Sequence, residues 1–120
     1  MQVRRVQAQI DRSFRKGNPR LIYQQHGSRE TRPLNEPVDR LGTRVVDCYG
    51  AIEEALDLFS SPRLIEFLNT IFEEVPRLFQ RLSFDQDSQQ GPHQDTAYVV
   101  VDRPIELAAC WIVSRRDQVN

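Results

Sequence analysis

The sequence has few of the residues that build disulfide frameworks and membrane spans. Only two cysteines occur in 120 residues, Cys48 and Cys110, and they form no Cys-x-x-Cys pair. We expect both thiols to be reduced and buried, Cys110 as a small hydrophobe inside an apolar run. No apolar stretch approaches the roughly 18 residues of a membrane-spanning helix. Because no apolar run of a secretory signal follows Met1, we predict a cytoplasmic protein without a membrane partner.

Neither sign of charge dominates the chain. The formal net charge is -1, which gives no overall attraction to nucleic acid, and no nucleic-acid partner is predicted. Residues 1–50 nevertheless hold ten basic and five acidic side chains, whereas residues 51–120 hold six and twelve. We interpret the basic excess as a solvated arginine-rich face, and an anion-binding surface is the alternative.

The first 50 residues predict a helix and then a short strand. Apolar side chains recur at helical spacing in residues 1–13, and the Gly-Asn-Pro sequence at 17–19 breaks the helix. Residues 20–25 predict a strand. Residues 26–37, with their glycine, prolines and asparagine, predict a loop, and residues 43–49 are compatible with a strand or a helix.

A pair of helices is predicted next. Apolar residues recur at helical spacing in 52–59, and Ser61-Pro62 supplies an N-cap and a proline at the first position of the second helix. Pro76 ends this second helix. Its apolar stripe is wide enough to be buried in a core, and consists of Leu64, Phe67, Leu68, Ile71 and Phe72.

The hydrophobic period changes to two after the second helix. Residues 78–84 predict one strand, and the β-branched and aromatic runs at 95–101 and 105–113 predict two more. Helices followed by strands predict an α+β domain in which N-terminal helices pack on a β-sandwich or jelly roll.

His93 and Asp95 form a candidate metal site. Side chains two positions apart in an extended chain lie on the same face, so one imidazole and one carboxylate can share a metal. Two histidines and a carboxylate suit iron(II), because three coordination positions stay open for a chelating cosubstrate and dioxygen. The spacing alone is weak evidence, since a His-x-Asp sequence occurs by chance in roughly one chain of this composition in seven.

The surroundings of this pair carry a family resemblance. The sequence at 82–84, the polar loop 85–91, the segment 93–98 and the apolar segment 107–112 together resemble the phytanoyl-CoA dioxygenase family, which are non-haem iron, 2-oxoglutarate-dependent oxygenases. The similarity covers residues 49–112, roughly half of the chain.

The resemblance implies roles for four residues. His93 and Asp95 would be ligands of Fe(II), while Gln94 and Trp111 would lie near 2-oxoglutarate. Asp95 favours hydroxylation, because the halogenases of the family have a small residue there that lets chloride bind the iron. The implied substrate is a small molecule or an acyl thioester, and the reaction oxidises it while 2-oxoglutarate is converted to succinate.

The third ligand of the family, a histidine well downstream, has no counterpart in this sequence. No histidine follows His93, so Arg115 and Arg116 cannot be assigned to the distal carboxylate of 2-oxoglutarate. His26 is interpreted as a solvated loop histidine. We therefore expect a truncated oxygenase fragment with little or no turnover, which self-associates through exposed strand edges.

The chain is thus predicted to be a single partial domain of the phytanoyl-CoA dioxygenase type. It comprises an N-terminal extension (1–48), a helical pair (49–75) and the first strands of a double-stranded β-helix, or jelly roll, with the His-x-Asp motif (76–113). The alternative is a non-catalytic, degenerate jelly-roll module that binds a partner or a small ligand. The missing histidine is compatible with both.

Overall fold

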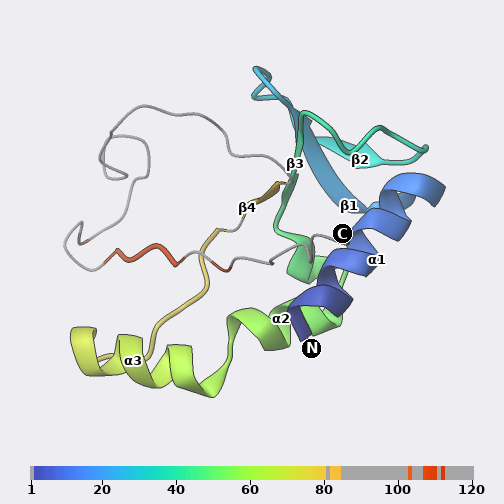
Figure 1. Ribbon diagram of the computed structural model, residues 1–120. Coiled ribbons are helices and arrows are strands. Elements are labelled where there is room, and N and C mark those ends of the chain that lie inside the picture. The colour runs from blue at the N-terminus through green and yellow to red at the C-terminus, as the bar shows by residue number, and fades with distance from the viewer. Residues whose placement is uncertain (1, 81, 85–102, 104–106, 111, 113–120) are drawn as a thin grey trace, which may run out of the picture. The chain divides into compact units, whose positions relative to one another are not determined.

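The computed structural model describes residues 2–80, 82–84, 103, 107–110 and 112. The chain divides into two compact units, Met1–Asp87 and Ser88–Asn120, and each is described by itself. Within its described residues the first unit contains three α-helices, one short 3-10 helix and a four-stranded antiparallel sheet (Figure 1). This arrangement confirms the predicted α+β class.

The sheet has the strand order β2-β1-β3-β4 and is not closed. The strands are β1 (Asn18–Gln25), β2 (Arg32–Leu34), β3 (Thr43–Val46) and β4 (Leu82–Phe84). The central pair, β1 and β3, is in register from Ile22 opposite Val46 to Gln25 opposite Thr43. Because β2 and β4 each pair with one strand, they form the two edges of the described sheet.

Helix α1 (Gln2–Lys16) packs its apolar side against the rest of the first unit. Val6, Ile10 and Phe14 are buried, and their spacing of four residues places them on one side of the helix. The helix continues to the residue before Gly17, which takes the left-handed conformation with φ +81°. The predicted break is therefore confirmed, although the helix is three residues longer than expected.

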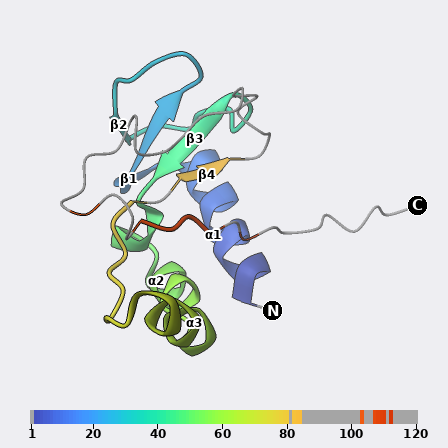
Figure 2. The same ribbon diagram turned by 90° about the vertical axis from the view of Figure 1, so that its left-hand side faces the viewer.

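The hydrophobic core lies between α1, the central strands and the segment that follows β3. The ring of Phe14 meets that of Tyr23 on β1 edge to face, with centroids 6.0 Å apart. The short helix η1 (Cys48–Gly50), helix α2 (Glu53–Phe59) and the residue before α2 add further buried apolar side chains, namely Cys48, Ala55, Phe59 and Ile52. Figure 2 shows α1 beside the sheet and α2 beyond one end of it. The buried thiol of Cys48 confirms its predicted burial.

Two predictions for residues 26–49 need correction or completion. The predicted loop 26–37 contains strand β2, and Pro33 is compatible with this edge strand because amides on the outer side of an edge strand have no ladder partner. The ambiguous segment 43–49 contains both kinds of structure, β3 and then η1. Asp47 lies between them in the left-handed conformation, with φ 47°.

Helix α3 (Pro62–Phe72) begins at Pro62 as predicted but ends before the expected position at Pro76. Glu73 takes the left-handed conformation (φ 56°), and its N–H donates to the Asn69 carbonyl, which closes the helix. The prediction that its apolar stripe is core is wrong. No residue of α3 is buried: Leu64, Leu68 and Phe72 are half-buried, and Phe67 is 61% exposed.

The later strands are found only in part. The predicted strand 78–84 is reduced to β4, and residues 76–80 adopt no regular structure. The predicted strand 95–101 lies outside the described residues, and residues 107–110 of the predicted strand 105–113 are in no helix or strand. Cys110 is exposed, so its predicted burial is wrong. Within the described part of the chain, no helix has the length and apolar character needed to cross a membrane.

Candidate metal centre

The predicted iron ligands His93 and Asp95 lie outside the residues that the structure describes, and so do Gln94 and Trp111. The structure does describe strand β4, which precedes these residues in the sequence. Strand β4 ends at Phe84, nine positions before His93. Strand β4 is therefore the last described element before the motif in the sequence.

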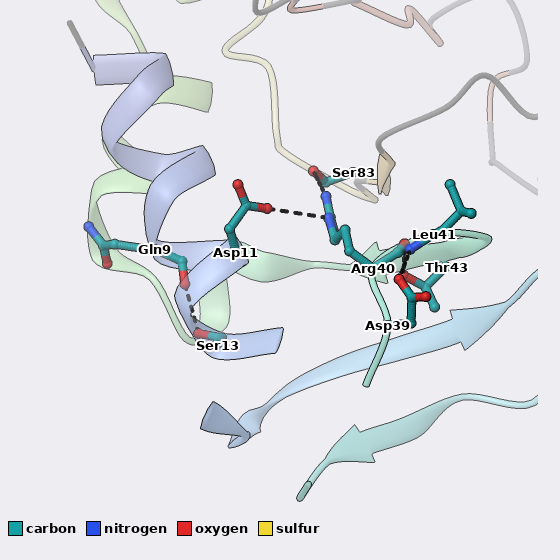
Figure 3. Close-up of polar contacts among 8 residues, drawn as sticks. All are labelled: Gln9, Asp11, Ser13, Asp39, Arg40, Leu41, Thr43 and Ser83. Atoms are coloured by element: carbon teal, nitrogen blue, oxygen red, sulfur yellow. Dashed lines mark hydrogen bonds and ion pairs between the residues drawn. The ribbon is translucent and has the colours of Figure 1, made fainter. Parts of the chain in front are cut away.

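Strand β4 is held on the sheet by its backbone and by one side chain from a distant loop. Its register places Ser83 opposite Val45 and Leu82 opposite Val46 on β3. The side chain of Arg40 adds a long hydrogen bond, in which Nη2 donates to Ser83 Oγ at 3.5 Å (Figure 3).

Arg40 is a junction between β4 and α1. Its Nε lies 3.7 Å from Asp11 Oδ1, and its guanidinium carbon lies 4.9 Å from the centroid of the Phe14 ring. The Arg40 side chain is only 13% exposed, so both contacts are more strongly felt than those of a surface arginine. One mostly buried charge thus ties the N-terminal helix to the strand that precedes the metal motif.

The loop that carries Arg40 is fixed by local hydrogen bonds. The Leu41 N–H donates to Asp39 Oδ1 at 3.0 Å, and Thr43 Oγ1 donates to the Arg40 carbonyl at 2.6 Å (Figure 3). Sequence reasoning missed Arg40 because its partners are distant in the chain, Ser83 being 43 positions away. A local pattern carries no signal for such a contact.

His26, the other histidine, is exposed in the turn after β1, and its backbone N–H donates to the Gly42 carbonyl at 2.6 Å. This position agrees with the prediction of a loop histidine. Among the described residues, no group of three histidine, cysteine, aspartate or glutamate side chains is placed to hold a metal ion.

Few ionisable groups in the described ranges have a shifted pKa. Burial raises the pKa of the Tyr49 phenol, and the neighbouring charges of Asp47 and Cys48 add to the effect. The hydrogen bond from Arg32 lowers the pKa of the exposed Glu30 carboxyl, and the attraction between their charges acts in the same direction. These groups are a tyrosine and a surface ion pair, and they form no acid–base pair for catalysis.

Comparison of the chain with models of protein families, with curated proteins and with solved structures gives no match.

Proposed function

We propose that this chain is part of a non-haem Fe(II), 2-oxoglutarate-dependent oxygenase of the phytanoyl-CoA dioxygenase type. The observation that carries the proposal is the His93-Gln94-Asp95 sequence within its wider context of polar loop and apolar segments. The donor set fits the metal, because an imidazole and a carboxylate two positions apart are two of the three ligands that iron(II) oxygenases use. The antiparallel sheet and the N-terminal helices support a domain that continues into a jelly roll.

The residues have separate parts in this proposal. His93 and Asp95 would hold the iron, and Gln94 and Trp111 would line the 2-oxoglutarate site. When bound, the iron would supply oxidation of a C–H bond in a small molecule or an acyl thioester by dioxygen, coupled to conversion of 2-oxoglutarate to succinate and carbon dioxide. The protein contributes positioning and the exclusion of water. The proposed location is the cytoplasm, where both cysteines stay reduced.

Metal binding tests the ligand assignment. Fe(II) is titrated without oxygen into the full chain and into the variants His93→Ala, Asp95→Ala and His26→Ala, with heat of binding as the readout. We expect one weak site that both motif substitutions abolish and that His26→Ala leaves intact. Equal binding by the His93→Ala variant would refute the assignment.

Turnover separates a fragment from a complete enzyme. We expect the chain with Fe(II), 2-oxoglutarate and oxygen to release little or no succinate, because only two of the three ligands are recognised in the sequence. Robust succinate release would show that these residues complete the site. The alternative, a degenerate jelly-roll module without catalysis, predicts a saturable partner or ligand whose binding is unchanged by removal of metal with a chelator.

We also propose that the chain self-associates through the edge of strand β4. The opposite edge, β2, carries Pro33, which blocks the pairing of another strand, whereas β4 carries none. Sedimentation equilibrium tests this with Leu82→Lys, which adds a charge on β4, and Leu41→Lys as the control in an exposed loop. We expect only the first to shift the mass toward the monomer. Equal effects of both would refute edge pairing.

A further inference from the structure

A shallow groove of about 470 Å³ lies between α1 and the start of α2, where Ala51 and Ile52 lead into that helix. The α1 side is lined by Arg5, Ala8, Gln9 and Arg12, and the opposite side includes Glu54. All of these residues precede residue 55. The groove is therefore independent of the proposed iron motif.

The helical repeat explains why two charged side chains, Arg5 and Arg12, border the groove while a small residue, Ala8, lines it between them. Arg5 and Arg12 are seven positions apart, which is two helical turns and about 10 Å along the axis, so both lie on one side of α1. Ala8 lies between them and has only a methyl group, which leaves a hollow. Two exposed guanidinium groups thus flank a space that the helix itself leaves open.

Hydrogen bonds fix the polar groups around this hollow. Gln9 Nε2 donates to the Glu54 carboxylate, which joins α1 to α2. Ser13 Oγ donates to the Gln9 carbonyl at 2.9 Å and accepts from Asn18 Nδ2 at 3.3 Å.

Arg5 and Arg12 differ from these hydrogen-bonded residues. Among the described residues, the side chains of Arg5 and Arg12 make no hydrogen bond or ion pair with each other or with the residues around the hollow. Both arginines are exposed to solvent.

We propose that this groove binds a phosphorylated small molecule, with its phosphate groups held by Arg5 and Arg12. A guanidinium presents paired donors that match phosphate oxygens, and two of them at this spacing can hold a diphosphate or two separate phosphates. The volume is within the range of small-molecule sites. Glu54 at the opposite wall repels phosphate groups, so a small ligand whose phosphates all lie on the arginine side fits the groove better than a long polyanion.

Inorganic pyrophosphate serves as the probe, titrated calorimetrically into the full chain at low ionic strength. We expect saturable binding that Arg5→Gln and Arg12→Gln each weaken roughly tenfold or more, because charge-assisted hydrogen bonds are lost. Arg29→Gln is the matched control, since Arg29 is exposed outside the groove, between β1 and β2. Absence of saturable binding, or an equal loss in the Arg29→Gln variant, would overturn the proposal.

Two further variants test the groove itself. Ala8→Leu fills the hollow without a change of charge and keeps a good helix former, so we expect it to abolish pyrophosphate binding. Glu54→Gln removes the opposing charge and should strengthen binding, while its amide oxygen can still accept from Gln9. Unchanged affinity in the Ala8→Leu variant would indicate diffuse attraction to a basic surface and would refute a site in the groove.

The same titrations distinguish the two sources of phosphate. A short single-stranded oligonucleotide is compared with pyrophosphate on the same chain and on the Ala8→Leu variant. The proposal expects pyrophosphate to bind and the oligonucleotide to bind no better. Tighter oligonucleotide binding that survives Ala8→Leu would overturn a small-molecule site. Circular dichroism of every variant confirms that α1 is retained.

Discussion

Gly17 holds the turn between α1 and β1 in a conformation that other residues resist. Its φ is +81°, and its N–H donates to the Ser13 carbonyl at 2.7 Å, closing the end of the helix. A Cβ atom added at this position would lie 2.9 Å from the carbonyl oxygen of Asn35, which follows β2. The substitution Gly17→Ala therefore combines backbone strain with a collision between two backbone segments.

The two effects can be separated with a matched glycine. Gly27 has almost the same φ, +79°, but an added Cβ would meet nothing within 4 Å. Gly27→Ala should cost only the left-handed conformation of an L-residue, about 1–2 kcal/mol of unfolding free energy. Gly17→Ala should cost about 2–5 kcal/mol, because a collision with backbone forces a shift that typically adds about 1–3 kcal/mol.

Urea denaturation followed by far-ultraviolet circular dichroism measures this difference. We expect the midpoints of both variants to fall while the slope m stays that of the parent chain, which identifies a change of stability. The Gly17→Ala midpoint should be the lower of the two. Equal midpoints would show that the turn after α1 does not approach Asn35 as closely as the structure has it.

Three further predictions follow from the described contacts. Ile10→Ala should lower the unfolding free energy by about 2–5 kcal/mol, whereas Phe67→Ala should change it by less than about 1 kcal/mol in urea denaturation, because only the first side chain is buried. Arg40→Met should lower it by about 1–2 kcal/mol through loss of its ion pair and its contact over an aromatic ring, and an unchanged midpoint would contradict the junction. In an NMR titration the pKa of the Glu30 carboxyl should lie below the ordinary value and rise in the Arg32→Gln variant. The stability from this pair is therefore present above the unfolded pKa and lost as the pH falls through the lowered one.

Local signals in the sequence predicted much of the first unit. Helix α1 and its glycine break, strand β1, and the starts of α2 and α3 all follow from periodicity and from the conformational limits of glycine and proline. Strand β2 was missed because three residues around Pro33 look like a loop, and only pairing with β1 makes them a strand. The early end of α3 at Glu73 was also missed, since a left-handed glutamate has no pattern in the sequence.

Burial was predicted less well because it depends on a partner. Helices α1 and α3 are both amphipathic, but the apolar stripe of α1 contains buried residues whereas no residue of α3 is buried. The stripe identifies which side is apolar and not what covers it. The contacts of Arg40 could not be predicted from local patterns either, because they join residues that are far apart in the sequence.

The proposed metal site also depends on residues that are far apart in the sequence, since His93 and Asp95 supply two ligands and the third ligand has to come from elsewhere. If a natural chain that continues past Asn120 supplies both that ligand and the jelly-roll strands, it should bind iron and also cover the stripe around Phe67. In that longer chain the α3 amides should be more protected from hydrogen exchange, and the affinity for iron should be higher, than in the present chain. Protection of α3 without iron binding would favour the non-catalytic jelly-roll module, because the fold would be complete while the ligand set was not.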